Sequence, residues 1–366
     1  MSSRSSDLEI FVPGIGQYDN IGDIILRRPL LDWLRDSGRL HVYVGNSPMG
    51  YDGGLRLQPS DVVYRSFRSW YFAAIRSSVT RRTAYFFKPG EIQLTLAGMK
   101  EHVAMVPLLL LLRAKGFRSA RIGSGTKNDS RLYSKIVRSI VRLSNLSLWR
   151  TRSTFSQLGG DGVMPDLAFG EGSGTELGNG ARDSLIVSMR SDRADPTAAW
   201  FDAITSIAES RGLKIVTVTQ VHRDESKSAL LAKKLGGSHV GWDGTDHSSQ
   251  EKLLREHYSR AVMVVSDRLH VLVAALTEGA IPIALLVDES AKISSHFEAA
   301  SLPTVTISSR EKTAEQIVVE VLSIEDKREL FDTGLAQSRR DLDVVRQRAN
   351  MLLRQPTPSK KRRRFS

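Results

Sequence analysis

The 366-residue sequence contains no cysteine, which excludes disulfides and thiolate metal sites and is compatible with a reducing compartment. Long hydrophobic runs are also missing, since the most apolar stretch, residues 104–112, is much shorter than the roughly 20 residues of a membrane-spanning helix. The polar first residues show no signal peptide. With 41% hydrophobic and 25% charged residues, the chain has the composition of a globular protein of two domains, and we expect it to be cytoplasmic.

Acidic residues are scarce in one region. Between Arg113 and Arg152 eleven basic side chains stand against one acid, Asp129, and the net charge of the chain is +12. A basic surface suits anionic lipid, phosphorylated substrates or nucleic acid. No helix-turn-helix, RNA-recognition or zinc-finger signature is present, so we expect peripheral contact with the inner face of the plasma membrane and no nucleic acid partner. Residues 355–366 are typical of a basic disordered tail.

The rest of the chain alternates strands and helices in two halves of similar size, which predicts an α/β protein with parallel sheets. The first half opens with a strand, residues 8–12, a glycine-containing loop, residues 14–23, and a helix. This opening fits a phosphate cradle, but a tight structural turn fits equally well, and Asp23 could be only the helix N-cap. Residues 171–182 have the composition of a linker.

Polar residues follow several strands of the second half, where ligands of such folds bind. Arg190 follows one strand, and Ser266–His270 follows another and precedes a helix. Arg268 and His270 place a cation and a titratable imidazole near a helix N-terminus, which Ser266 or Asp267 could cap. The pattern predicts an anion site with a proton donor, although this corner alone fits a surface arginine and a packed histidine equally well.

Several motifs resemble those of the polysaccharide pyruvyl transferase family. They are Ser266–His270 with the downstream Gly279-x-x-Pro282, and the Gly-Gln-Tyr-Asp-Asn-Ile-Gly-Asp sequence of residues 16–23. Arg150, ahead of residues 165–169, and the strand ending in Arg190 stand where that family has similar elements. Two segments depart from the family pattern. Residues 87–91 replace a frequent Gly-Gly-Gly segment, and residues 123–126 match loosely, so both departures fall on the acceptor side.

The resemblance implies two Rossmann-like domains in a GT-B-like fold, facing across a cleft. Residues 1–170 would form the basic acceptor side and residues 183–354 the donor side. The implied reaction transfers the pyruvyl group of phosphoenolpyruvate to a sugar of a cell-surface polysaccharide or its lipid-linked precursor. It forms a cyclic ketal and releases phosphate, and the scheme requires no metal or other cofactor.

The resemblance also implies a set of site residues. His270 is the expected acid–base residue and part of the phosphoenolpyruvate site, whose members are Arg190, Ser266, Arg268, Leu269 and His270. The first loop would approach the cleft through Gly16, Asn20, Gly22 and Asp23. Asp23 is the catalytic candidate for activating the acceptor, with Asp19 and Asp195 as further candidates, and structural roles remain the alternative for all three.

Two other interpretations stay open. A GT-B glycosyltransferase with a nucleotide-sugar donor would explain Glu278–Pro282, which resembles a segment with which many such enzymes hold a ribose. An inactive scaffold that binds polyanions or membranes is the third interpretation. His222, His247 and His257 are expected to have surface or packing roles.

Overall fold

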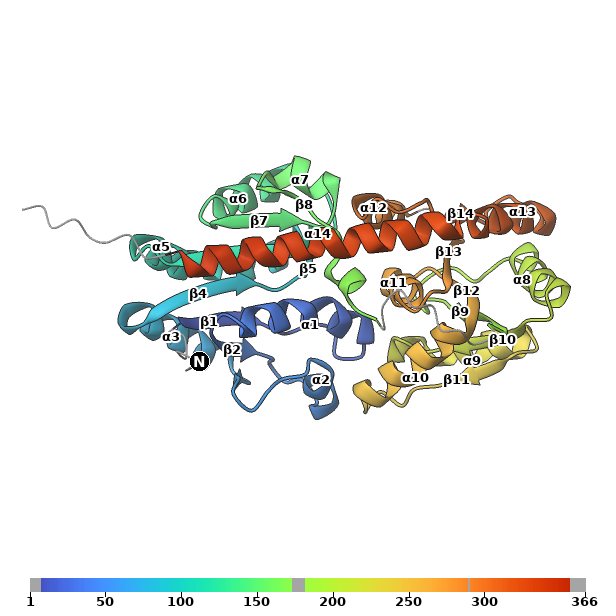
Figure 1. Ribbon diagram of the computed structural model, residues 1–366, viewed down its shortest axis with the longest axis horizontal. Coiled ribbons are helices and arrows are strands. Elements are labelled where there is room, and N and C mark those ends of the chain that lie inside the picture. The colour runs from blue at the N-terminus through green and yellow to red at the C-terminus, as the bar shows by residue number, and fades with distance from the viewer. Residues whose placement is uncertain (1–7, 173–181, 289, 356–366) are drawn as a thin grey trace, which may run out of the picture.

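The computed structural model describes residues 8–172, 182–288 and 290–355, and the chain forms two parallel β-sheets surrounded by helices (Figure 1). This confirms the predicted α/β fold with two Rossmann-like domains. Residues 173–181 of the predicted linker and residues 356–366 of the predicted tail lie outside the described residues.

The first sheet has the strand order β3-β2-β1-β4-β6-β7-β8, with β5 paired to β6. The order reverses beside β1, which is the arrangement that creates a ligand-binding crevice in doubly wound sheets. Its strands are β1 (Leu8–Pro13), β2 (Arg39–Tyr43), β3 (Val62–Tyr64), β4 (Arg82–Phe87), β5 (Gly90–Ile92), β6 (Arg118–Thr126), β7 (Leu146–Trp149) and β8 (Gly162–Val163). The helices of this half are α1 (Ile21–Arg35), α2 (Met49–Gly54), α3 (Phe67–Thr80), α4 (Leu96–Ala104), α5 (Val106–Ala114), α6 (Arg131–Val141) and α7 (Arg152–Leu158).

The second sheet has the order β11-β10-β9-β12-β13-β14 and reverses beside β9. Its central strands are fully buried, as their near-continuous apolar sequences require in a sheet covered on both faces. Its strands are β9 (Ser184–Ser188), β10 (Lys214–Val218), β11 (Ser238–Val240), β12 (Ala261–Ser266), β13 (Ile281–Leu286) and β14 (Thr306–Ser308). Its helices are α8 (Ala198–Ser210), α9 (Glu225–Lys234), α10 (His247–Arg260), α11 (Leu269–Thr277), α12 (Ala291–Ala299), α13 (Ala314–Glu325) and α14 (Arg328–Arg354).

The carboxyl ends of the strands in the first sheet face the carboxyl ends of the strands in the second sheet. Asn20, after β1, forms an antiparallel bridge with Val221, after β10. Beside it the backbone N–H of His222 donates to the carbonyl of Asp19 (2.8 Å), and Asp19 also pairs with Arg223 (2.6 Å). Loops at the carboxyl edges of both sheets therefore meet directly.

The last helix connects the two halves. α14 runs along both of them (Figure 1), and its C-terminal part contacts the first domain through Arg346, which pairs with Asp36 at 2.6 Å, and through Leu353, whose carbonyl accepts from Arg82. The expected second domain, residues 183–354, thus includes a helix that packs on both domains.

Short elements depart most from the expected pattern. The basic helix α6 ends at Val141, because the chain turns at Arg142 and Leu143 before β7 begins at Leu146. The strands β3, β5 and β11 hold three residues each, too few to show a periodic pattern in the sequence.

Candidate active site

The corner between β12 and α11 is tied to the neighbouring strand. Ser266 Oγ donates to the carbonyl of Ser188 at the end of β9 (2.5 Å) and accepts from the backbone N–H of Arg268 (3.0 Å). Asp267 accepts from the backbone N–H of Arg190 (2.8 Å), and burial raises the pKa of its carboxyl. Neither Ser266 nor Asp267 caps α11, whose N-cap residue is Arg268. The capping expectation was wrong, since both side chains instead hold the ends of β9 and β12 together.

The two predicted donor-binding arginines each lie two residues after one of these adjacent strands, Arg190 after β9 and Arg268 after β12. Arg268 donates from Nε to Asp224, and its two terminal nitrogens form no hydrogen bond with any described residue. Arg190 forms a two-pronged contact with Asp192 (2.8 and 2.7 Å), whose carboxylate is half exposed. Both guanidinium groups are therefore positioned before any ligand arrives. Leu269 differs, because its side chain belongs to the hydrophobic core and only its backbone could contact a ligand.

His270 lies between the two domains. A Cβ placed on Gly22 of α1 would stand 2.7 Å from His270 Cβ, so only glycine allows this approach. His270 Nε2 is buried without a hydrogen-bond partner among the described residues and lies 3.6 Å from Asp166 Oδ2. Asp166 is fully buried and accepts from Arg150 Nη1 (2.8 Å). Burial raises the pKa of Asp166, but Arg150 and then His270 outweigh it and hold that pKa well below the usual range.

The glycine-containing loop reaches the same place. Asn20, not Asp23, caps α1, because its side chain accepts from the backbone N–H of Gly22 (2.9 Å). Asp23 accepts from the Gln17 N–H (2.7 Å) and pairs with Arg27 (3.2 Å). Although burial raises the pKa of Asp23, Arg27, the Gln17 N–H and His270 lower it overall.

Gly16 fits this arrangement closely. A Cβ on Gly16 would lie 2.6 Å from the Asp23 carboxylate, so the loop folds directly over that side chain. Of the four predicted loop residues, Gly22 therefore approaches His270 directly and Asp23 is coupled to its charge, whereas Asn20 caps α1 and Gly16 lies against Asp23.

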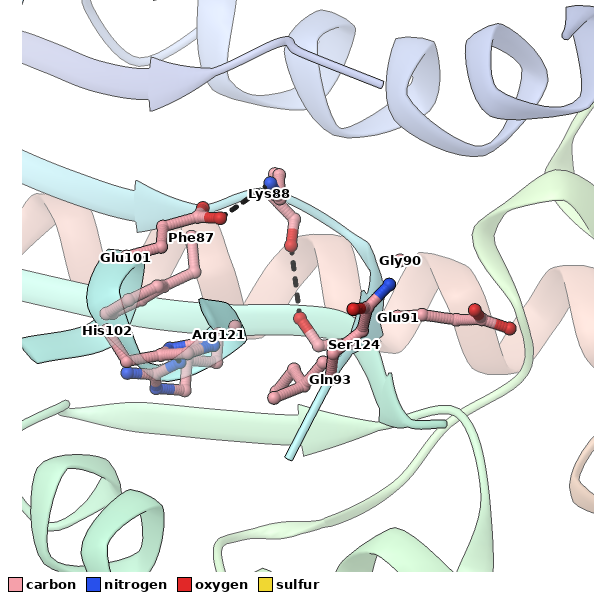
Figure 2. Close-up of a pocket in the computed structure, with 11 residues that line it drawn as sticks. Phe87, Lys88, Gly90, Glu91, Gln93, Glu101, His102, Arg121 and Ser124 are labelled. Carbon is pink, nitrogen blue, oxygen red and sulfur yellow. Dashed lines mark hydrogen bonds and ion pairs between the residues drawn. The ribbon is translucent and has the colours of Figure 1, made fainter. Parts of the chain in front are cut away.

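Sequence reasoning missed Lys292 and Glu91. Lys292, in the first turn of α12, pairs with Glu91 of β5 across the two domains (2.5 Å). Burial lowers the pKa of Lys292, Glu91 opposes this, and the charges of Arg150 and Arg190 lower it further. Lys292 therefore lies close enough to Arg150 and Arg190 to be repelled by both. A lysine beginning a helix after a central strand could have suggested this position, whereas Glu91, on a three-residue strand, had no signal. Glu91 also lines a cavity of the first domain (Figure 2).

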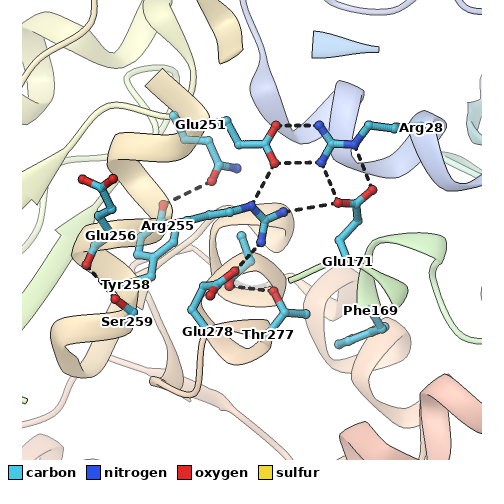
Figure 3. A network of polar contacts seen from close by, with 12 residues as sticks. Arg28, Phe169, Glu171, Glu251, Arg255, Glu256, Tyr258, Ser259, Thr277 and Glu278 are labelled. Carbon is cyan, nitrogen blue, oxygen red and sulfur yellow. Dashed lines mark hydrogen bonds and ion pairs between the residues drawn. The ribbon is translucent and has the colours of Figure 1, made fainter. Parts of the chain in front are cut away.

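The segment expected to hold a ribose lies elsewhere. Glu278 is at the C-terminal end of α11, away from the carboxyl ends of the strands, and pairs with Arg255 (2.6 Å) in a buried network (Figure 3). In the structure the carboxylate that this interpretation assigns to a ribose is therefore paired with Arg255. The basic stretch from Arg113 to Arg152 does not lie entirely on the protein surface, because Arg121 and Arg150 are buried.

The other candidate acids and histidines have structural contacts. Asp19 pairs with Arg223 across the domains, and Asp195 is largely exposed and pairs with Lys227. His247 is buried and bonds through Nε2 to the carbonyl of Tyr18 (2.6 Å), which supports the expected packing role.

The described residues contain no group of three or more acidic or histidine side chains placed to hold a metal ion. Within the same residues, no helix combines the length and the apolar character that crossing a membrane requires.

Two facing Rossmann-like domains of this kind define the GT-B fold, and the comparison with solved structures shows it. Similar structures include a UDP-N-acetylglucosamine 2-epimerase from Neisseria meningitidis bound to UDP-GlcNAc (TM-score 0.56, 10% identity, covering 94% of this chain and 99% of that one). Another UDP-N-acetylglucosamine 2-epimerase has a TM-score of 0.55 at 13% identity, covering 96% and 98% of the two chains. Phytolacca americana UGT2, complexed with UDP-2-fluoro-glucose and pterostilbene, has a TM-score of 0.53 at 11% identity, covering 95% and 100%. The sequence matches no family model and no curated protein.

Proposed function

We propose that the protein is a transferase that takes the pyruvyl group of phosphoenolpyruvate and attaches it to a sugar as a cyclic ketal. The observation that carries this proposal is the position of His270, which the first-domain loop and Asp166 hold at the same strand ends as Arg190, Arg268 and Lys292. The site thus combines a proton donor with several fixed cations.

The charges suit the donor. Phosphoenolpyruvate carries a phosphate and a carboxylate, and guanidinium groups bind both through paired, charge-assisted hydrogen bonds. Arg268 has two terminal nitrogens available, and the partner of Arg190, Asp192, is half exposed and can exchange with a ligand. Lys292 and the backbone N–H groups at the start of α11 add positive potential.

The chemistry requires a proton and two nucleophiles. A proton from the imidazolium of His270 adds to the methylene carbon of the enol, which leaves a cation at the neighbouring carbon. The two sugar hydroxyls attack that carbon, and its bond to the phosphate oxygen breaks. One hydroxyl proton restores His270 and the other leaves with phosphate, so the reaction balances without an oxidant or reductant.

Asp166 acts here as a positioning residue. A carboxylate beside Nε2 orients a histidine and stabilises its charged form, and Arg150 keeps Asp166 ionised. The other ring nitrogen, Nδ1, lies beside α1, because a Cβ on Gly22 would stand 3.0 Å from it. Asp23 is also held ionised, and its lowered pKa suits a second electrostatic partner of His270 better than a general base.

The acceptor is a glycan or its lipid-linked precursor. Helix α6 exposes Leu132 and Ile136 beside the exposed basic residues Arg131 and Lys135. An exposed apolar and basic helix face suits the surface of an anionic membrane, where a lipid-linked acceptor resides. Peripheral contact there remains part of the proposal.

A second candidate is a glycosyltransferase or epimerase that uses a nucleotide sugar. It is favoured by the fold, because solved structures of the same fold contain UDP or UDP-sugars. Glu278, the residue expected to contact the ribose, pairs with Arg255 in the structure, and the start of α11 could hold a diphosphate.

Ligand-dependent thermal stability separates these functions. A ligand at a hundred times its Kd stabilises a protein by about 2.7 kcal/mol. We expect phosphoenolpyruvate to raise the Tm and UDP and GDP to leave it unchanged. The opposite result would favour the nucleotide-sugar function, and no shift with any of them would favour an inactive scaffold.

A pair of arginine variants sharpens this experiment. Arg268→Met should abolish the shift produced by phosphoenolpyruvate, because it removes one charged fork at the corner. Arg131→Met, an exposed arginine of α6, makes the same chemical change outside the site and should keep the shift. Equal shifts in both variants would remove Arg268 from the donor site.

A further inference from the structure

A second cationic site lies in the first domain, in a cavity of about 170 Å³ at the carboxyl ends of β4 and β6. One water molecule needs only about 10–15 Å³, so the cavity has room for a group of several heavy atoms. Its lining includes Phe87, Lys88, Glu91, Glu101, His102 and Arg121 (Figure 2). Apart from Glu91, which pairs with Lys292, the proposed function uses none of these residues.

Arg121 of β6 is the unusual member of this cavity. Its side chain is 0% exposed, and no carboxylate forms an ion pair with it in the described part of the chain. Its guanidinium carbon lies 3.2 Å from the centre of the Phe87 ring, and its Nη1 donates to His102 Nδ1 (3.2 Å). A buried charge without a counter-charge is unfavourable, so this one needs an explanation.

The neighbouring charged residues do not compensate the buried charge of Arg121. Glu101, whose charge favours the protonated form of Arg121, already accepts from Lys88 Nζ at 2.8 Å. Burial lowers the pKa of Arg121 to about 9, so the side chain still carries its proton at neutral pH. Burial, Arg121 and Lys88 lower the pKa of His102 to about 3, which leaves that imidazole neutral and able to accept from Arg121. One positive charge therefore remains uncompensated in the cavity.

The free donors of Arg121 have a useful geometry. Nε and Nη2 have no hydrogen-bond partner among the described residues, while Nη1 is occupied by His102. Nε and Nη2 form one edge of the guanidinium group, and two parallel N–H groups on such an edge match the two oxygens of a carboxylate. The stacked Phe87 ring and the contact with His102 keep this edge fixed.

The cavity also adjoins the candidate active site. Figure 2 shows Arg121 and His102 at one end of the cavity and Glu91 at the other. Glu91 pairs with Lys292 of the second domain, and the carbonyl of Ser124, another lining residue, accepts from the backbone N–H of Arg150 (3.1 Å). A ligand that extends from the cavity past Glu91 would thus arrive beside the donor.

We infer that this cavity binds a carboxylate of the acceptor, with Arg121 as the recognising residue, so that the acceptor is an acidic glycan containing a uronic acid or a similarly carboxylated sugar. Its place in a transfer reaction rests on the proposed function, whereas the binding of a carboxylated sugar does not. A single unpaired guanidinium suits the single charge of a carboxylate better than the double charge of a phosphate.

The test is calorimetric titration of the whole protein with glucuronate, glucose and inorganic phosphate. We expect glucuronate to bind and glucose, which lacks the carboxylate, to bind at least about tenfold more weakly, as the loss of a charged hydrogen-bonded contact implies. Absence of glucuronate binding to the wild-type protein would overturn the inference. Phosphate binding in place of glucuronate binding would overturn the assignment of a carboxylate.

Two variants and a control locate the site. Arg121→Met should abolish glucuronate binding, and it should raise the Tm of the unliganded protein because it removes an uncompensated buried charge. Gln93→Trp places a large ring at an exposed position of the lining and should block the cavity with Arg121 intact, which keeps the test decisive if Arg121→Met does not fold. Arg131→Met should bind glucuronate normally, and binding that survives both cavity variants would contradict the inference.

The outcome can be separated from that of the proposed function. Phosphoenolpyruvate is titrated into the same samples. Glucuronate binding that depends on Arg121, without any effect of phosphoenolpyruvate, would leave the cavity assigned and remove the pyruvyl donor. The reverse pattern would keep the donor and remove the acidic acceptor.

Discussion

The two ends of α11 carry two different clusters of charges. At its C-terminal end, Glu278 joins a network in which Arg28 contacts Glu251 (2.7 Å) and Glu171 (2.6 Å), and Arg255 contacts Glu251 and Glu278 (Figure 3). At its N-terminal end, His270 has a buried Nε2 without a hydrogen bond to any described residue, and Arg268 has terminal nitrogens to spare. One helix thus links a cluster in which each arginine contacts at least two carboxylates with one in which Arg268 keeps terminal nitrogens without an acceptor among the described residues.

This difference in pairing indicates a structural role for the cluster at the C-terminal end of α11 and a functional role for the one at its N-terminal end. In the first network each arginine bridges at least two carboxylates from different segments, and this raises the pKa of Arg28 and lowers that of Glu251 to about 2 despite burial. Such pairing joins the two domains. Because these charged groups already have partners, they offer a ligand little binding energy. At the other end, donors held in place without acceptors are what a binding site requires before its ligand arrives.

The largest effect on function is expected from His270→Ala. Removing a general acid typically lowers turnover by about 10²–10⁴-fold. The measurement is the rate of phosphate release from phosphoenolpyruvate with a lipid-linked glycan fraction as acceptor. Unfolding by urea should change little, because the imidazole is imperfectly paired, and wild-type turnover in this variant would refute the acid–base role of His270.

At the C-terminal end of α11 we expect a large loss of stability instead. Arg28→Met leaves Glu171 and Glu251 buried without this partner and should lower the free energy of unfolding by about 3–5 kcal/mol. Urea denaturation measures the loss. The control is Arg346→Met, which breaks an exposed pair with Asp36 and should cost about 1 kcal/mol or less. Similar losses in both variants would show that the buried network has no special structural role.

A third change tests how closely the domains approach at His270. Gly22→Ala adds a methyl group 2.7 Å from His270 Cβ, and overpacking of this kind costs about 1–3 kcal/mol. Turnover should fall more than stability because the methyl group displaces the imidazole. Gly53→Ala, where a Cβ would have no neighbour nearer than 3.6 Å, is the matched control and should behave as wild type in both assays.

The contrast between the two ends of α11 also shows which features could be predicted from the sequence. The corner Ser266–His270 was predictable, because a strand, a polar turn and a helix follow one another along the chain, and such corners bind ligands in parallel α/β folds. The loop before α1 was recognisable by its pattern, but its role in packing against His270 depends on a contact between residues almost 250 positions apart.

Contacts between distant segments explain what the sequence did not reveal. The pairs Lys292–Glu91 and Arg28–Glu251 join different domains, so nothing local indicates them. Arg121 was counted with a basic surface because charge counting does not separate exposed from buried arginines. The strand β6 that holds Arg121 is buried, but its sequence, RSARIGSGT, contains no apolar run that would indicate this.

The smallest expected effect concerns pH and His296, a neighbour of the site that is only 4% exposed. Burial and the charge of Arg150 lower its pKa to about 3, with Lys292 acting in the same direction and Asp166 opposing. Its Nδ1–H donates to the carbonyl of Lys292 (2.7 Å), which holds the neutral ring. The buried ring therefore stays uncharged at pH values at which an exposed histidine is protonated.

The sign of the pH effect follows from proton binding. Between pH 6.5 and about 3 the unfolded chain protonates this histidine and the folded protein does not. Stability must therefore fall as the pH is lowered through this range, by up to about 1.4 kcal/mol per pH unit. His296→Leu removes this contribution, so urea denaturation at several pH values should give a flatter profile than that of the wild type, whatever the change in absolute stability. An unchanged slope would mean that His296 is protonated in the folded protein, and the incompletely paired end of α11 would then hold one more positive charge than its geometry indicates.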